Sequence, residues 1–238
     1  MDLSTLTPDE VVVFSLGPVD VNLTIVSTWG VMVLLIGGSL VITRRLSTDT
    51  APARWQHLLE VVVDYTRQQI REITGGHPPD TYLPFVGTLF LFIAVTNLLM
   101  IVPGYVPSTA SLSTTTALAL CVLVAVPLYA IRGQGVRTYL RHYLQPTPLM
   151  LPFTVIGELS RTLALAVRLF GNVMSGTKIV AVLLAVAPVF FPAVLGLLGL
   201  LTGFIQAYIF AILSMVYIAS GMQAQREPEP TTHTAGRR

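Results

Sequence analysis

Long apolar runs, separated by short polar segments, are the main pattern along the chain. A helix needs about 20 apolar residues to cross the hydrocarbon core of a bilayer. The runs that reach this length are residues 21–42, 82–102, 112–131, 149–187 and 190–219. The pattern therefore predicts an all-α integral membrane protein with about five transmembrane helices.

Residues 52–73 follow a different pattern. Apolar residues such as Leu58 and Val62 alternate with charged residues such as Glu60 and Asp64. A helix with one apolar face and one strongly charged face lies at the membrane surface and does not cross the bilayer. This segment is predicted to be an interfacial amphipathic helix.

Composition supports a membrane location and excludes other classes. Hydrophobic residues make up 53% of the 238 residues, whereas charged residues make up only 11%. Soluble domains carry about 25% charged residues, so the chain is not an ordinary soluble enzyme, a nucleic-acid binder or a disordered protein. The single cysteine, Cys121, excludes an intrachain disulfide and is expected to be a small core residue. The sequence has no nucleotide-binding loop and no metal-ligand spacing, so no nucleotide, metal or cofactor is expected.

The positions of the arginines predict the orientation of the chain. Positively charged loops stay on the cytoplasmic side of a membrane, and the loops at residues 103–111 and 188–192 contain no basic residue. The N-terminus is therefore expected outside and the C-terminus inside. We expect a single membrane domain over residues 1–238, with an external segment at 1–20 and a flexible cytoplasmic tail at 222–238. The arginines follow the first, third and last runs: Arg44, Arg45, Arg54, Arg132, Arg137, Arg141, Arg226, Arg237 and Arg238.

The run at residues 149–187 is too long for a simple span. As one helix it would be about 58 Å long, against a hydrocarbon core of about 30 Å. The helix must break, extend into water or lie strongly tilted. Because the next run is also long, the last two runs are predicted to form a long, strongly tilted hairpin.

One face of this long run carries a polar stripe. Its members are spaced by three, four or seven residues, which places them on one side of a helix. Gly171 and Ser175 are small enough to let another backbone approach closely. The stripe consists of Glu158, Arg161, Arg168, Asn172, Ser175 and Lys178.

Arg168 lies in the middle of the stripe, and its charge needs a partner. A charged side chain at the bilayer centre costs about 3 kcal/mol or more. Glu158 is ten residues away, and the apolar runs around Asn97 and Thr115 contain no acid. We therefore expect the counter-charge to come from another chain. The alternative is a structural ion pair within this chain.

The other charged residues of the stripe have simpler explanations. Glu158 and Arg161 could form a local salt bridge near the cytoplasmic interface. The flexible side chain of Lys178 is expected to reach the outer interface.

The last run carries a thinner polar stripe, formed by Thr202, Gln206, Ser214 and Tyr217. Two neighbouring helices are thus expected to present polar faces to a common partner. As an alternative, Gln206 could simply join helices of this chain by a hydrogen bond.

The residues around Arg168 closely resemble the signature of the a subunit of F-type ATP synthases. The resembling stretch is ELSRTLALAVRLFGN, from Glu158 to Asn172, and GFIQAYIF at residues 203–210 resembles the last helix of that family. Similar segments extend along nearly the whole chain: FVGTLFLF from Phe85, NLL from Asn97, IVPG from Ile101, STT from Ser113 and LMLP from Leu149.

The resemblance implies a non-catalytic stator subunit of a rotary ATP synthase in the bacterial cytoplasmic (inner) membrane. Its implied partners are a rotating ring of c subunits, the b subunits of the peripheral stalk, the remaining synthase subunits and membrane lipid, but no nucleic acid. Arg168 matches the family's essential arginine, which faces the c-ring carboxylate. Protons would reach and leave that carboxylate through two offset half-channels.

The resemblance also assigns roles to other residues. Asn172, Gln206 and Glu158 match polar family positions along the ion path. Further expected path residues are Ser175, Thr177, Ser111, Ser214 and Tyr217, and expected interface residues are Arg161, Gly171 and Gly203.

The chain departs from the family pattern on the outer side. The family usually has an acid nine residues after the arginine, or an acid or histidine at the matching place in the last helix. Thr177 and Gly199 stand at these positions, and Ser111 and Ser113 stand where an aspartate often occurs. A path without a titratable group also suits a hydrated cation, so Na⁺ is an alternative to the proton. A secondary transporter is a more distant alternative, and the chain has no internal repeat to support it.

Overall fold

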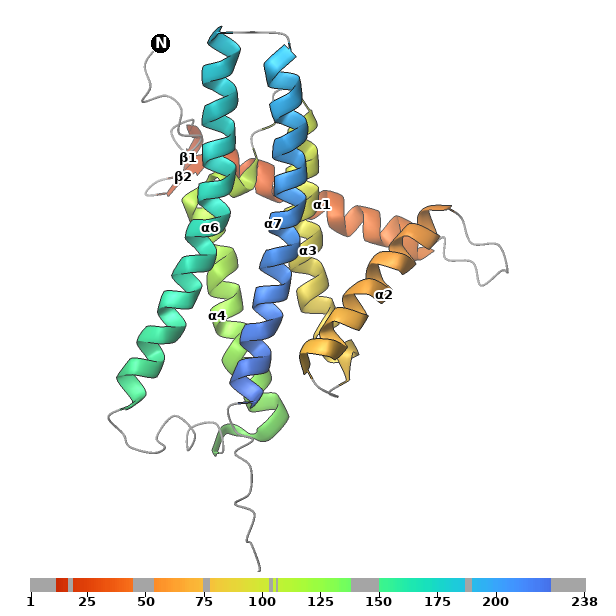
Figure 1. Cartoon of the computed structure of the whole chain (residues 1–238), viewed down its shortest axis with the longest axis vertical. Helices are drawn as coiled ribbons and strands as arrows, with labels where there is room; N and C mark the ends of the chain where they lie inside the picture. Colours follow the sequence, from red (N-terminus) through yellow and green to blue (C-terminus); the bar gives the residue numbers. More distant parts are fainter. Residues whose placement is uncertain are drawn as a thin grey trace, which may run out of the picture.

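A computed structural model describes residues 12–16, 19–44, 54–74, 78–102, 105, 107–137, 150–186 and 190–223. Long helices dominate it (Figure 1). They are α1 (Leu23–Arg44), α2 (Arg54–Thr74), α3 (Leu83–Leu98), α4 (Leu112–Gln134), α6 (Met150–Val186) and α7 (Phe190–Gln223), with short 3-10 turns η3 (Pro79–Thr81), η4 (Leu99–Ile101) and η5 (Ser108–Ala110).

The predicted spans are confirmed. Within the described ranges, five helices are long and apolar enough to cross a membrane, and they coincide with the five apolar runs. Their outer surfaces carry large apolar side chains such as Trp29, Val33, Leu163 and Leu197. Such a surface is stable only against lipid or another protein. The predicted cytoplasmic tail from residue 224 onward lies outside the described residues.

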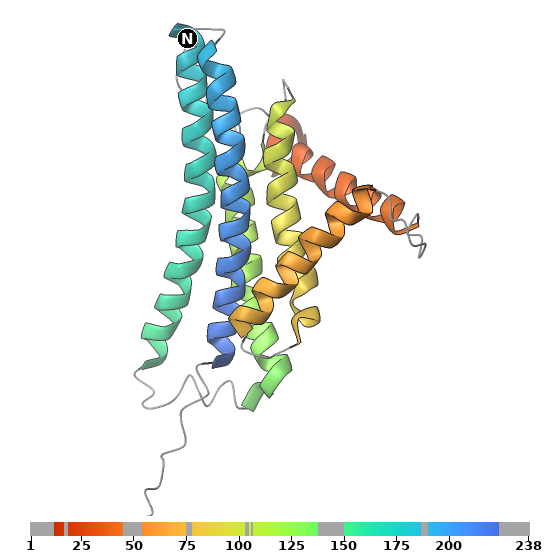
Figure 2. The ribbon, with the colours of Figure 1, turned by 45° about the vertical axis from the view of Figure 1, so that its right-hand side comes forward.

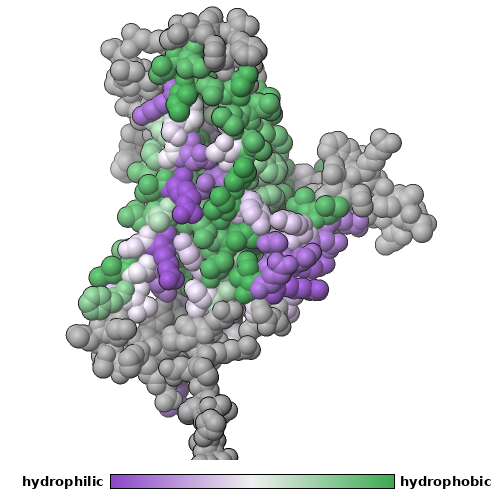
Figure 3. All heavy atoms as spheres, viewed as in Figure 1, coloured by the Kyte–Doolittle hydropathy of each residue, from purple (hydrophilic) through white to green (hydrophobic). Residues whose placement is uncertain are grey.

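Helix α2 has the predicted amphipathic character. Its residue Ile70 is fully buried against the bundle, whereas the side chains of Asp64 and Arg67 are 75% and 40% exposed. Figure 3 shows hydrophilic side chains gathered over α2. Arg67 Nε donates a hydrogen bond to Asp80 Oδ1 at 3.0 Å, which ties α2 to η3. Apolar residues of α2, α3 and α7 line a cavity of about 450 Å³ that opens to the surface.

The segment before α1 contains a short hairpin that the sequence analysis did not predict. Strands β1 (Val12–Leu16) and β2 (Val19–Asn22) pair antiparallel, with Leu16 opposite Val19. The signal was present in the sequence, because β-branched residues flank a Gly-Pro turn. The hairpin precedes the membrane helices and leaves the helical fold class unchanged.

The two last helices form the longest pair. Figures 1 and 2 show α6 and α7 side by side and antiparallel, with α1 at a wide angle to both. Helix α6 is continuous over 37 residues, which corresponds to about 55 Å. The long hairpin is thus present, and its tilt relative to a membrane stays a prediction.

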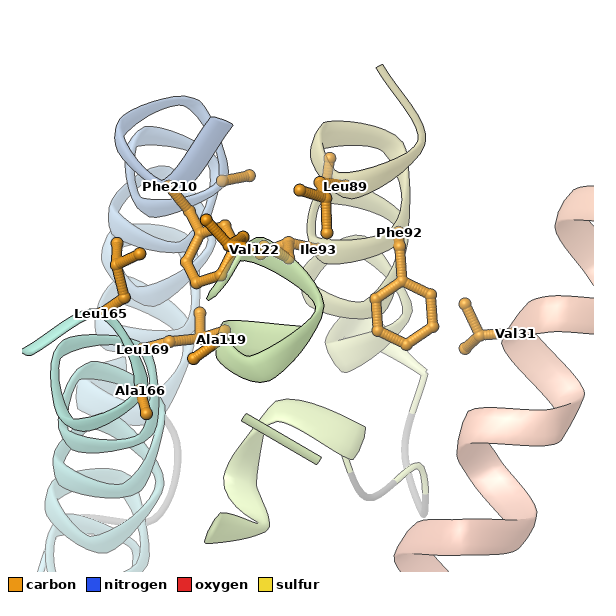
Figure 4. Packing of buried hydrophobic residues seen from close by; sticks show 12 residues of the cluster. Val31, Leu89, Phe92, Ile93, Ala119, Val122, Leu165, Ala166, Leu169 and Phe210 are labelled. Carbon is orange, nitrogen blue, oxygen red and sulfur yellow. The ribbon is translucent and has the colours of Figure 1, made fainter. Parts of the chain in front are cut away.

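The core lies where α3, α4, α6 and α7 meet (Figure 4). Phe210 of α7 is fully buried between the other helices, and Phe92 of α3 faces Val31 of α1. The remaining core side chains are mostly Leu, Ile, Val and Ala, including Leu89, Ile93, Ala119, Val122, Leu165, Ala166 and Leu169.

The prediction for Cys121 was wrong. Its side chain is exposed on α4, although its neighbour Val122 is buried. In a membrane helix, apolar residues face lipid as well as the core, so an apolar neighbourhood alone does not indicate burial inside the protein.

Candidate functional site

The polar stripe on α6 is a real surface feature. In Figure 3, hydrophilic side chains follow α6 between green, apolar surfaces. Arg161, Arg168, Ser175 and Lys178 are exposed, whereas Glu158 and Asn172 are half-buried at the edge of the stripe. One side of α6 therefore joins the core, and the other offers a line of polar groups to a neighbour.

Arg168 points away from the core of this chain. Leu165, Ala166 and Leu169, which flank it along the helix, are buried, whereas Val167 beside it is 52% exposed. Among the residues that the structure describes, Arg168 has no hydrogen bond or ion pair. A guanidinium stays charged at any accessible pH, so this surface must meet a negative or strongly polar group.

The five spanning helices do not provide that group near Arg168. Glu158 is the only acid in the sequences of the five spanning helices, and it lies ten residues from Arg168, about 15 Å along the helix. The expectation that the counter-charge comes from another chain is consistent with this arrangement.

Toward the start of α6, the polar residues meet α4 and α7. Glu158, Arg161, Thr162, Tyr217 and Ser220 line a small cavity of about 20 Å³ together with apolar residues of α4. This is about the space of a single water molecule. The guanidinium carbon of Arg161 lies 5.7 Å from the centre of the Tyr217 ring, a cation–π contact.

Toward the C-terminal end of α6, the hydroxyl groups bond to their own helix. Ser175 Oγ donates to the Asn172 carbonyl at 3.1 Å, and Thr177 Oγ1 donates to the Met174 carbonyl at 3.0 Å. A hydroxyl that donates in this way can still accept a hydrogen bond from water or from an arriving group. Thr177 therefore adds an acceptor where the family often has an acid.

The expected polar face of α7 is turned inward, so the prediction of a shared outer polar surface was wrong for this helix. Gln206 is only 6% exposed and Ser214 is fully buried, while Tyr217 is half-buried. The reason is Gly203, whose missing side chain lets α3 pack on this side of α7. Thr202 remains exposed.

Gln206 and Ser214 differ in how their polar atoms are satisfied. Ser214 Oγ donates to the Phe210 carbonyl at 2.7 Å. Gln206 Nε2 is buried with no hydrogen-bond partner within the described part of the chain. Buried polar groups almost always have partners, so an amide donor that none of the described residues satisfies is an unusual feature of α7.

Ser111 lies at the start of α4. It is buried, and its Oγ is 2.9 Å from Ser113 Oγ. The preceding turn, η5, packs against α6, which brings this segment close to that helix. Gly171 is exposed, and none of the described residues would contact a Cβ atom there, so a close approach at Gly171 could come only from elsewhere.

Asn97 is a buried polar residue for which the sequence predicted no role. Asn97 of α3 is 2% exposed, and its Nδ2 donates to the Gly203 carbonyl of α7 at 3.0 Å. The signal was available, because Asn97 is a lone amide in an apolar run. Its partner could not be found from the sequence, since the two residues are 106 positions apart.

Five apolar helices define a multi-pass membrane protein, and one of them exposes an arginine that has no ion pair among the described residues. Comparison with known proteins agrees. Residues 25–219 match the ATP synthase A chain family. The chain is 59% identical to ATP synthase subunit a 2 of Acaryochloris marina, with 93% of this chain and 94% of the relative covered.

Other relatives are similar over comparable lengths. The identity is 55% to ATP synthase subunit a 1 of Chlorobaculum parvum, with 93% and 98% covered. It is 56% to ATP synthase subunit a of Nitrosospira multiformis, with 90% and 85% covered. The chain belongs to the ATP synthase A chain family, and it is a membrane-sector subunit that is not catalytic by itself.

Proposed function

We propose that this subunit guides protons between two offset half-channels and a ring of c subunits, with Arg168 at the point where the two paths are separated. The observation that supports this most strongly is the position of Arg168. It is exposed in the middle of the polar stripe on α6, and the described residues of the chain give it no counter-charge.

The proposed chemistry is a change in the pKa of a ring carboxylate. In lipid, a carboxyl group stays protonated because burial disfavours the charged form. Beside the guanidinium of Arg168 the ionised form is favoured, so the proton leaves. As the ring turns, each carboxyl would lose its proton beside Arg168 and regain one on the other side. The same positive charge blocks direct proton flow between the two half-channels.

We assign the inner half-channel to the start of α6. Glu158, Tyr217 and Ser220 surround a cavity the size of a water molecule, with Arg161 held against the Tyr217 ring. A carboxylate, two hydroxyls and a water molecule can pass a proton between them.

We assign the outer half-channel to the hydroxyl and amide groups beyond Arg168. Asn172, Ser175 and Thr177 lie on α6, Gln206 lies on α7, and Ser111 belongs to the turn that packs against α6. These groups can hold a chain of water molecules, although none of them titrates near neutral pH. Ser214 bonds to its own helix deeper in the bundle and has a secondary role at most.

The absence of a titratable group at Thr177 and Gly199 supports Na⁺ as the alternative coupling ion. The test is to measure ATP hydrolysis and pH-gradient formation in inverted membrane vesicles with and without Na⁺. Proton coupling predicts a pH gradient that forms without Na⁺ and collapses with a protonophore. Strict dependence of hydrolysis on Na⁺ would replace the proton with Na⁺.

The orientation and partners are part of the same proposal. Arginines after the first, third and last spans favour an external N-terminus and a cytoplasmic C-terminus in a bacterial inner membrane. The exposed face of α6 would meet the c ring, and the remaining apolar surface would meet the b subunits and lipid. Gentle purification should recover the chain with a c ring and a soluble ATPase. Recovery as a monomer with substrate uptake would contradict the proposal.

A further inference from the structure

A single polar contact joins α3 to α7 beside Gln206. Asn97 is buried at 2% exposure, and its Nδ2 donates to the Gly203 carbonyl at 3.0 Å. The nearby contacts between the two helices are apolar, such as the edge-on pair of Phe90 and Phe204, whose ring centres are 6.0 Å apart. Apolar contacts are not directional, whereas a hydrogen bond requires a particular distance and angle.

The contact tolerates only glycine on the α7 side. A Cβ atom at position 203 would lie 2.8 Å from Asn97 Cγ, 3.0 Å from Asn97 Cβ and 3.1 Å from Asn97 Nδ2. These distances are shorter than ordinary contacts between carbon atoms. Gly196 is two turns earlier on the same helix, and none of the described residues would contact a Cβ atom there. The close approach is therefore a local property of position 203.

Gln206 follows Gly203 by three residues, so the two share one side of α7. Gln206 is also buried, and its Nε2 has no partner among the described residues. The hydrogen bond from Asn97 thus holds α7 at Gly203. Gln206 lies about one helical turn away, and its Nε2 has no partner among the described residues. A helix turns by about 100° for each residue, so a small slip or rotation of α7 would move Gln206 out of place.

We propose that Asn97 is a positioning residue for ion translocation: its hydrogen bond to Gly203 sets the register and rotation of α7 against α3 and thereby holds Gln206 on the ion path. This inference rests on the proposed function, because it assigns Gln206 to the outer half-channel. It adds Asn97 of α3 to the residues that translocation needs. Asn97 acts only by holding α7 in place.

The first experiment tests the contact. Gly203→Ala and the matched control Gly196→Ala are compared in the whole ATP synthase, by ATP-driven ion pumping in inverted vesicles and by the amount of assembled complex. We expect Gly203→Ala to lower pumping at least fivefold at normal assembly, and Gly196→Ala to stay within twofold of the unchanged protein. Equal pumping by the two variants would overturn the proposal.

The second experiment tests positioning. Gln206→Cys is introduced together with Cys121→Ala, and the rate at which Ag⁺ blocks the new thiol in the intact complex is measured by labelling the remaining thiols after denaturation. Asn97→Val, which has similar bulk but no donor, is then added. We expect the thiol to react when Asn97 is present and its rate to change at least fivefold with Asn97→Val.

The outcomes separate the two claims. An unchanged reaction rate with Asn97→Val would mean that Asn97 only joins two helices, which overturns the positioning role while the ion path stands. A thiol at position 206 that does not react even beside Asn97 would place this residue off the hydrated path. That result would refute the assignment of Gln206 in the proposed function, and the positioning role with it.

Discussion

Replacing Gln206 by methionine should stabilise the subunit and at the same time reduce its activity. The amide of Gln206 is 6% exposed, and its Nε2 has no partner in the described part of the chain. Leaving a buried donor unpaired costs about 1–3 kcal/mol. Methionine has a similar length and flexibility and no such donor. Gln206→Met should therefore recover a large part of that free energy.

The gain can be expressed as a shift in melting temperature. For a protein of this size, 1 kcal/mol corresponds to about 2–4 °C, so Gln206→Met should raise the Tm by roughly 2–8 °C if the recovered free energy is about 1–2 kcal/mol. Tm is measured on the purified complex in detergent at a fixed scan rate, because membrane complexes unfold irreversibly. ATP-driven pumping is measured on the same preparation and should fall at least fivefold.

A surface glutamine provides the control. Gln68 is exposed on α2, where its Nε2 donates to Glu72 Oε1 at 3.2 Å. Gln68→Met should change stability by less than about 0.5 kcal/mol and leave pumping unchanged. If Gln206→Met lowers the Tm, the amide is satisfied in the protein and the reasoning from its unpaired donor is wrong. If pumping is unchanged, Gln206 is not on the ion path.

Three further predictions concern other parts of the molecule. Tyr217→Phe keeps the ring under Arg161 and should preserve stability, whereas Tyr217→Leu should cost about 0.5–1 kcal/mol in the free energy of unfolding. Phe210→Ala empties the centre of the core and should cost about 3–5 kcal/mol, measured as loss of assembled complex at growth temperature. A reporter fused to the C-terminus should be active only in the cytoplasm; an active external reporter would contradict the topology.

The helices were predictable because a bilayer requires long apolar runs, and these runs are unambiguous in the sequence. The stripe around Arg168 was predictable for the same reason, since polar residues are conspicuous in an apolar helix. The structure then shows which side of α6 packs against the bundle, since Leu165 and Leu169 are buried while Arg168 is exposed.

The packed side of α7 was not predictable. Gln206 and Ser214 were expected to face a partner, yet both are buried in the bundle, and Gly203 of the same helix admits Asn97 of α3. Hydropathy cannot separate a lipid-facing side from a core-facing side when both are apolar, which also explains the error at Cys121. In this fold, the decisive information was a close approach between residues far apart in sequence.

The central claim is that Arg168 supplies the positive charge against which a partner's carboxylate loses its proton. The most direct test is ATP-driven ion pumping by the whole synthase carrying Arg168→Ala, with assembly measured in parallel. Because Arg168 points away from the core, we predict that assembly stays near normal while pumping is abolished. Coupled pumping at an appreciable rate without this arginine would contradict the account.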